Sequence, residues 1–313
     1  MTDFVPPLEF GNRAFYGLQS RDGHVVVIDS PREIDRSDVP IDPPRDVVVH
    51  AAYMAAPVAT QLLRRGFRGF IGVDAGIGRN AAGIGGLPLA DAHSVPAAAI
   101  SVYSCDMCAG ASVWADGVIS SANASAAALG VQPGQSTAEA AALMLRAPPG
   151  QARELHGSLP DADFPLQPAP DSRVFGCWSM SLLHGERTRD VFCVGTPVDT
   201  TMTIYVYRHA VRPAGIIGSD GGFGRHRMAV AGLPILQAMG IPCAAVSHLS
   251  ADLGDPRSIY RDGRISLVNA LAHSAGVVPD MPAVDAAERL LRARDKAGGE
   301  TAARETAAHE TAG

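Results

Sequence analysis

Two loops of this sequence carry residue types that bind anions and transfer protons. Residues 72–80 read Gly-Val-Asp-Ala-Gly-Ile-Gly-Arg-Asn, and residues 218–226 read Gly-Ser-Asp-Gly-Gly-Phe-Gly-Arg-His. Glycines let backbone amides approach an anion, and the arginine can pair with a carboxylate or phosphate. The aspartate suits a general base or a metal ligand. We therefore predict two catalytic carboxylates, Asp74 and Asp220, and a set of substrate-binding residues: Gly76, Gly78, Arg79, Gly222, Gly224 and Arg225.

A structural alternative exists for the same loops. The glycines could only shape a tight turn, and the aspartate could cap the helix that follows. The motif is not the dinucleotide-binding fingerprint, because the glycine spacing differs and the aspartate precedes the glycines. The functional interpretation is favoured because both Asp and Arg recur, whereas a turn requires only the glycines.

A second polar motif also occurs twice. Ser101-x-x-Ser104-x-Asp106 returns as Ser247-x-x-Ser250-x-Asp252, each time after an apolar run. Groups that follow strands should face the same crevice as the glycine loops. Asp106 and Asp252 are predicted to be catalytic or metal-binding. Ser104, Ser250, Asn123 and Asn269 are predicted to contact the substrate, while Asp116 and Asp262 are interpreted as helix N-caps.

The two halves differ in residues that could carry chemistry. His248 stands where the first half has Val102, and Asp252 and Asp255 follow it closely. Histidine titrates near neutral pH, so His248 is predicted to be an acid–base or metal-binding residue, against the alternative of a hydrogen-bonded buried imidazole. His50 and His24 are weaker candidates. Cys105 and Cys108 form a Cys-x-x-Cys of the first half only, either a redox pair, half of a zinc site or two buried thiols.

Both motifs belong to one long internal repeat. Residues 72–147 align without a gap onto residues 218–293, and roughly 30 of the positions are identical. A repeat of this length exceeds a solenoid unit. It predicts two fused copies of one module, facing each other about a pseudo-twofold axis.

The elements that must position these residues alternate between strands and helices. This order predicts an α/β fold with two fused modules, each a mainly parallel sheet flanked by helices. A capping-box pattern at Ser136 marks the start of a helix, and Gly130 a helix end. Strands are expected at 14–19, 24–29, 46–50, 69–73, 96–101, 174–178, 190–194 and 214–218, and helices at 54–65, 81–93, 117–129, 199–209 and 283–296.

Composition suggests the limits of the modules. Residues 1–147 form the first copy, the Pro-rich segment 148–172 a linker, and residues 173–297 the second copy. Residues 298–313 repeat Ala, Thr and Glu without an apolar stripe, so we expect a disordered tail.

Charge and residue usage exclude several function classes. The net charge of −6 and the lack of basic runs argue against a nucleic-acid or anionic-membrane partner. The single lysine, Lys296, lies outside the motifs, which removes P-loop and Schiff-base chemistry. Five cysteines, no long apolar run and no signal-like start at residues 1–7 predict a cytoplasmic protein. No cofactor signature is evident, a divalent metal is possible, and so is a homo-oligomer.

These observations favour an enzyme over other classes. Asp, Ser, Asn, His and Arg together, without cofactor motifs, predict a hydrolase of a small polar or anionic metabolite, with the site in the groove between the copies. The alternative is a cytoplasmic two-lobed protein that binds or senses a small anion without catalysis. An assembly subunit without chemistry is a third and weaker hypothesis.

Overall fold

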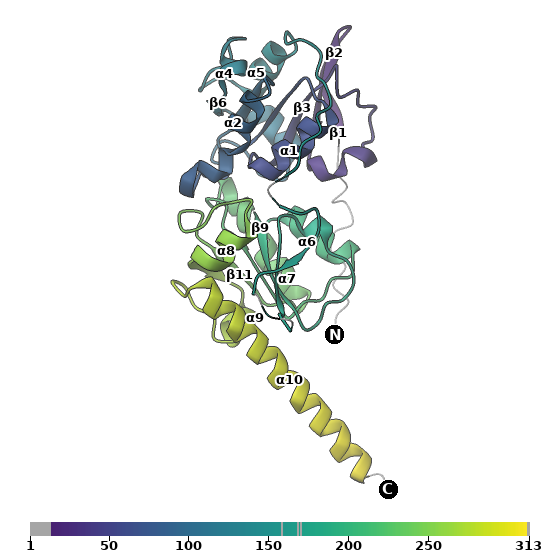
Figure 1. Cartoon of the computed structure of the whole chain (residues 1–313), viewed down its shortest axis with the longest axis vertical. Helices are drawn as coiled ribbons and strands as arrows, with labels where there is room; N and C mark the ends of the chain where they lie inside the picture. Colours follow the sequence, from purple (N-terminus) through teal and green to yellow (C-terminus); the bar gives the residue numbers. More distant parts are fainter. Residues whose placement is uncertain (1–13, 158, 168, 170, 312–313) are drawn as a thin grey trace.

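The structure, a computed structural model, describes residues 14–157, 159–167, 169 and 171–311. It contains two six-stranded sheets with helices on both faces, so the predicted α/β fold with two modules is confirmed. Module one is the half that contains the first sheet, and module two is the half that contains the second. Figure 1 shows them stacked along the long axis of the molecule, with module one above and the C-terminal helix leading away below. The segment 1–7 and the last two residues of the tail, about which we made predictions, lie outside the described residues.

The first sheet is mainly parallel with antiparallel edges. Its inner strands β2 to β5 run parallel to one another, while β1 and β6 pair antiparallel at the two ends. The strand order follows the chain: β1 (Ala14–Ser20), β2 (Gly23–Ile28), β3 (Val47–Tyr53), β4 (Gly69–Val73), β5 (Ala97–Ile100) and β6 (Ile119–Ala122).

The second sheet repeats this arrangement. Its strands pair in the same order and sense, β7 (Phe164–Pro165), β8 (Val174–Cys177), β9 (Val191–Pro197), β10 (Gly215–Ser219), β11 (Cys243–Val246) and β12 (Ile265–Val268). The edge strand β7 comes from the Pro-rich segment between the copies. From β4 onward each strand of module one has its counterpart 146 residues later, whereas β3 and β9 are offset by 144.

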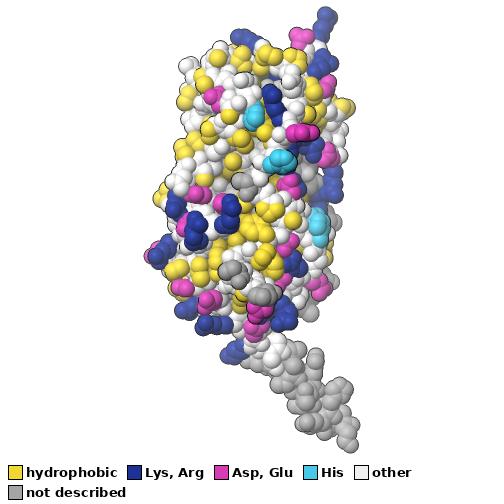
Figure 2. Space-filling view, in the orientation of Figure 1, with side chains coloured by type: hydrophobic (Ala, Val, Ile, Leu, Met, Phe, Trp, Pro, Cys, Tyr) yellow, Lys and Arg dark blue, Asp and Glu magenta, His cyan; other side chains and the backbone are white. Residues whose placement is uncertain are grey.

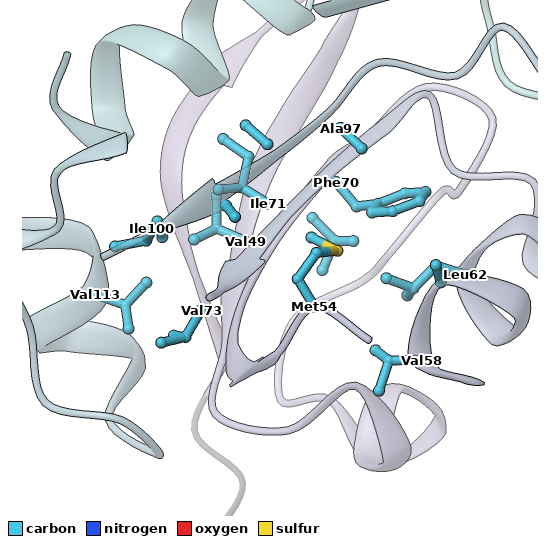
Figure 3. Packing of buried hydrophobic residues seen from close by; sticks show 14 of the residues in the cluster. Val49, Met54, Val58, Leu62, Phe70, Ile71, Val73, Ala97, Ile100 and Val113 are labelled. Carbon is cyan, nitrogen blue, oxygen red and sulfur yellow. The ribbon is translucent and has the colours of Figure 1, made fainter. Parts of the chain in front are cut away.

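Helices cover both faces of each sheet. Figure 3 shows Leu62 and Val58 packed on the face that carries Phe70, and Val113 on the face that carries Ile71. The α-helices of module one are α1 (Ala56–Arg65), α2 (Gly86–Asp91), α3 (Gly110–Asp116), α4 (Ala124–Ala127) and α5 (Thr137–Met144). Those of module two are α6 (Thr200–Arg208), α7 (Gly232–Ala238), α8 (Pro256–Asp262), α9 (Ala270–Ser274) and α10 (Ala283–Thr311). Four short 3₁₀ segments complete the set: η1 (Pro31–Arg36), η2 (Arg79–Ile84), η3 (Met180–Leu182) and η4 (Arg225–Val230).

One predicted helix is wrong. The segment 117–129 contains the strand β6 and the short helix α4, while α3 ends just before it at Asp116. Gly117 has an extended backbone and lies so close to Val113 that an added Cβ would be 2.3 Å from the carbonyl oxygen. The chain therefore leaves the helix at this glycine and pairs with β5. The capping box at Ser136 is confirmed, with Glu139 completing it.

The last helix is longer than the sequence led us to expect. α10 continues past residue 297 to Thr311, through the segment that we expected to be disordered. Alanine, glutamate and arginine have high intrinsic helix propensity, which accounts for a helix there without an apolar stripe.

On the face shown in Figure 2, acidic and basic side chains are intermixed over both modules.

His50 is a fully buried imidazole of β3 that packs against Gly72 of β4. A Cβ added at Gly72 would lie 2.2 Å from the ring, so only glycine fits beneath it. Burial lowers the pKa of His50 to about 4. Module two has Val194 at the equivalent place, given the offset of 144, which shows that the fold accepts an apolar side chain here.

We predict that His50→Val reduces the loss of stability in acid. Above the unfolded-state pKa of about 6.5 the imidazole is neutral in both states. As the pH falls toward 4, the unfolded chain binds a proton that the folded protein does not, so the wild type loses stability. Between pH 7 and pH 4.5 the variant should lose about 2–3 kcal/mol less unfolding free energy than the wild type, measured by urea denaturation. The exposed His273, changed to Gln, is the control and should follow the wild type. Equal acid losses in wild type and His50→Val would contradict the prediction.

Candidate functional site

The two glycine loops lie at the ends of β4 and β10, as predicted, but they face each other across the boundary between the modules. A Cβ added at Gly222 would be 2.9 Å from the Cα of Gly76, and both glycines have positive φ, +75° at Gly76 and +71° at Gly222. Gly78 and Gly224 pack in the same way against His248 and Val102 of the other module. The glycines therefore permit backbone contact between modules, and the space beside them is filled by protein.

Arg225 reaches across this boundary and binds four groups of module one. Its guanidinium donates to the Asp106 carboxylate at 3.0 Å, to the Asp116 carboxylate at 2.7 Å, to the Ser112 hydroxyl at 2.6 Å and to the Ser104 carbonyl at 3.0 Å. The guanidinium lowers the pKa of both carboxyl groups, which keeps them ionised. The predicted anion-binding arginine is engaged with the protein's own carboxylates.

Arg79 makes the reciprocal contacts from module one to module two. It donates to the Ser250 carbonyl at 3.0 Å and lies 3.0 Å from Asp262 and 3.8 Å from Asp252. The backbone amides of Arg79 and Arg225 donate to the carbonyls of His248 and Val102, both at 2.8 Å. Next to the arginines, Asn80 donates to Asp252 at 2.9 Å, and His226 lies 2.9 Å from Asp106.

Asp116 and Asp262 do not cap helix N-termini, so that prediction is wrong. Each is the last residue of its helix, α3 or α8, and its carboxylate accepts a hydrogen bond from a serine hydroxyl one turn earlier. From there each reaches the arginine of the other module. The helix C-terminus, and not the N-terminus, therefore presents the carboxylate to the boundary.

Asp74 and Asp220 connect each glycine loop to the end of the next strand. The Oδ1 of Asp74 accepts from the amides of Gly76 and Val102, both at 3.0 Å. The Oδ1 of Asp220 accepts from the amides of Gly222 at 3.1 Å and His248 at 2.9 Å, and it also lies 2.8 Å from the His248 Nδ1. Burial opposes ionisation of Asp220, but these hydrogen bonds outweigh it and lower its pKa. The structure thus brings His248 and Asp220 together, with the ring against Gly76 of the other module.

The four predicted contact residues hold the loops and helix starts. Asn123 and Asn269 are buried N-caps of α4 and α9, and both sides of each amide bond the backbone. The hydroxyls of Ser104 and Ser250 donate to carbonyls three residues earlier and accept from the amides of Val118 and Arg264. All four side chains are occupied by the protein itself.

A small cavity between the modules collects polar groups that the sequence did not single out. It measures about 40 Å³ and lies beyond the C-terminal ends of β2, β3, β8 and β9. The two modules contribute residues from equivalent positions to its wall. Ser30 corresponds to Ser179, and Ala52 corresponds to Thr196. The paired registers of β2 with β3 and of β8 with β9 establish these equivalences. The cavity therefore lies on the pseudo-twofold axis.

Two charged residues of this cavity have no charged equivalent in the other module. Asp199 is 5% exposed and caps α6 by accepting from the Met202 amide at 2.8 Å. Burial raises the pKa of Asp199 to about 6. Ala55 stands at the same place in module one and makes no cap. Arg32, whose equivalent is Ser181, lies with its guanidinium 5.0 Å from the centre of the Trp178 ring and donates to the Ser181 hydroxyl at 2.8 Å.

Neutral donors surround these two charges. Tyr53 is almost fully buried, and its hydroxyl donates to the Trp178 carbonyl at 3.3 Å. Burial raises the pKa of Tyr53, so the phenol stays protonated. Burial lowers the pKa of Arg32, but it remains a cation. Among the described residues, no carboxylate forms an ion pair with Arg32.

Cys108 contacts Asp199 from the other module. Its thiol interacts with the Asp199 carboxyl and with Thr201, and burial together with the nearby carboxylate raises the pKa of the thiol. Cys108 has a φ of +66°, and its counterpart Gly254 has +92° and packs on Ala55 and Pro57. All five cysteines are free, so Cys105 and Cys108 form no disulfide. Burial also raises the pKa of Cys105, to about 12.

Comparison with protein-family models found no match for this chain. Comparisons with curated proteins and with solved structures found no significant match either.

Within the part of the chain that the structure describes, no three His, Cys, Asp or Glu side chains are grouped so that they could hold a metal ion. Over the same residues, no helix has the length and apolar character needed to cross a bilayer.

We predict that Arg225→Ala weakens folding. The change removes four hydrogen bonds across the boundary and leaves Asp106 and Asp116 without their cation. Because the Arg225 side chain is 26% exposed, water compensates part of the loss, and we expect a decrease of about 1–2 kcal/mol in unfolding free energy. Chemical denaturation measures it.

Arg257→Ala is the matched control. Arg257 is 50% exposed and pairs with Asp255 of its own helix start, so its loss should change the unfolding free energy by less than about 0.5 kcal/mol. An Arg225 variant as stable as the Arg257 variant would show that Arg225 does not stabilise the module boundary.

Proposed function

We propose that this protein is an enzyme that binds a small anionic molecule in the cavity on the pseudo-twofold axis and transfers protons through Asp199. Hydrolysis is the reaction that we propose, with Arg32 as the anion-binding group. The observation that carries the proposal is the buried Asp199 carboxyl, whose pKa of about 6 lies near neutral pH, in the same cavity wall as an arginine that pairs with no carboxylate of the described residues. Groups with such perturbed pKa values concentrate at functional sites.

Asp199 has the properties of a general base. With a pKa of about 6 the carboxyl is mostly ionised at neutral pH, yet it is basic enough to take a proton from a water molecule as that water attacks the substrate. Tyr53, Ser179 and Thr196 place neutral hydroxyls in the wall, each hydrogen-bonded to a protein group and each with lone pairs that can still accept. The cavity volume corresponds to roughly three water molecules.

Arg32 supports an anionic substrate. A guanidinium out of bulk water is stabilised by a charged oxygen ligand, and a carboxylate can accept two parallel hydrogen bonds from it. The guanidinium lies 5.0 Å from the centre of the Trp178 ring, within the range of a cation–π contact. We therefore propose a carboxylate as the group that Arg32 binds.

The proposed site occurs once in the chain. Asp199 and Cys108 meet at one of two equivalent places, whereas Ala55 and Gly254 meet at the other. A duplicated fold with one set of charged groups supports one molecule of substrate per chain. The five free thiols support a reducing compartment, and we propose the cytoplasm.

A second candidate function is binding without catalysis. A cavity between two lobes, at the axis that relates them, is also where a two-lobed sensor would hold a ligand. The two proposals share Arg32 as the anion-binding residue and differ in Asp199. A binding protein needs no group that titrates near neutral pH.

We predict separate effects of Asp199→Asn and Arg32→Ala on catalysis. A panel of small esters and amides that bear a carboxylate is assayed, the esters by acid release at constant pH and the amides by release of the amine. Asp199→Asn should lower kcat roughly 100-fold or more, because the base is lost, with KM within a few-fold. Arg32→Ala should raise KM about 10-fold or more, because a charge-assisted pair is lost.

Asp255→Asn and Arg257→Ala are controls, since this exposed pair lies outside the cavity. Full turnover by Asp199→Asn would exclude Asp199 as the base. Carboxylate binding that depends on Arg32, with no turnover of any panel member, would favour the binding protein.

The pH dependence of kcat/KM gives a further prediction. A general base must be ionised, so activity should be lost as the pH falls through the pKa of Asp199, about 6, and be retained above it. Turnover at substrate concentrations well below KM is measured from pH 4.5 to 8, so that the profile reports the free enzyme. If activity falls at the same low pH in the wild type and in the residual activity of Asp199→Asn, the group whose protonation causes the loss is not Asp199.

A further inference from the structure

Trp178 separates the small cavity from a much larger one. The second cavity measures about 270 Å³ and lies between α1 and the chain at His156, Gly157, Leu159 and Asp161. Trp178 belongs to the wall of both cavities although it is only 3% exposed. Its side chain is therefore a partition one residue thick.

Two polar contacts of the Trp178 ring are weak. The indole Nε1 donates to Asp161 at 3.3 Å, a long hydrogen bond, and the Arg32 guanidinium lies 5.0 Å from the ring centre. A carboxylate binds the edge of a guanidinium, and the guanidinium must turn its edge into the small cavity to meet it. Binding in the small cavity would thus loosen one of these two contacts.

The small cavity alone is too small for most substrates. At about 40 Å³ it accommodates a carboxylate group and little more, whereas ligand pockets typically begin at about 300 Å³. The large cavity supplies most of that volume and has hydrogen-bonding walls, with Thr60, Gln61, Arg64 and Asp161. Arg64 and Asp161 neutralise each other at 2.8 Å, so the cavity suits a polar body without net charge.

We propose that the two cavities are halves of one binding site. The ligand is a carboxylate whose uncharged polar body passes the displaced Trp178 indole and occupies the large cavity. The inference rests on the proposed function, because Arg32 holds the carboxylate. It adds the size and chemistry of the rest of the substrate, and it makes Trp178 a movable wall of the site.

Intrinsic fluorescence tests the inference, since the chain has only two tryptophans. In a Trp114→Phe background, emission reports on Trp178. Two probes are titrated, acetate, which fits the small cavity, and N-acetylglycylglycine, which carries a carboxylate and an uncharged polar body. The longer probe should bind at least about 10-fold more tightly than acetate and should change the Trp178 emission, because the indole moves.

Gln61→Phe fills part of the large cavity, and Gln61→Ala is its control because it removes the same amide without adding volume. Gln61→Phe should weaken the longer probe about 10-fold and leave acetate unchanged, whereas Gln61→Ala should leave both within a few-fold. Arg32→Ala should weaken both probes.

The outcomes separate the two proposals. Suppose that both probes bind with equal affinity, that Gln61→Phe changes neither affinity and that Arg32→Ala weakens both. This result would overturn the proposal that the two cavities form one site and leave the anion-binding role of Arg32 intact. Insensitivity to Arg32→Ala would overturn the proposed function. Absence of any response to millimolar probe would overturn both.

Discussion

The close approach of Gly76 and Gly222 is the contact on which the relation between the modules depends. Any side chain at either position would meet the opposite backbone, and the positive φ of each residue independently favours glycine. Because the backbones meet there, the arginine three residues later in each loop passes into the other module and reaches its helix C-terminus. The ends of β3 and β9 are thereby held on either side of the axis, and the small cavity lies between them.

This arrangement explains why the repeated residues are structural. A pseudo-symmetric boundary uses the same residue types twice. Each loop contacts residues of the other module, and their equivalents in its own module are contacted by the opposite loop. Asp, Arg and Ser recur in both halves because both halves complete the same contact, and Asn123 and Asn269 recur because each caps the equivalent helix of its own module. A reaction at the axis, in contrast, needs different groups on its two sides. The informative positions are then those at which the copies differ, such as Asp199 and Ala55.

Much of the fold could be predicted from the sequence because alternating apolar segments and an ungapped repeat leave few topologies. The strand β6 after Gly117 was missed because the Ala-rich residues 122–128 that follow it suit a helix, and its pairing with β5 makes it a strand. The site was harder. The ends of β4 and β10 were predicted to within one residue, whereas β3 and β9 run three residues beyond their predicted ends. A sequence does not reveal that Arg225 meets Asp106 and Asp116 across 109 or more residues of chain. Arg32 and Asp199 lie before the aligned segments, where the halves differ in length, so the repeat gave no reason to compare them with Ser181 and Ala55.

Asp199 combines the structural role of a helix cap with the proposed role of a base, two roles that place opposite demands on its charge. An N-cap carboxylate is stabilised as an anion by the helix amides, here through the Met202 amide, whereas burial favours the neutral acid. Burial prevails, and the balance leaves the pKa of Asp199 at about 6. Proton transfer need not break the cap, because Oδ1 can accept the Met202 hydrogen bond in both protonation states. One oxygen can therefore hold the start of α6 in place while the other gains and loses a proton, which would keep the proposed base in position through both protonation states.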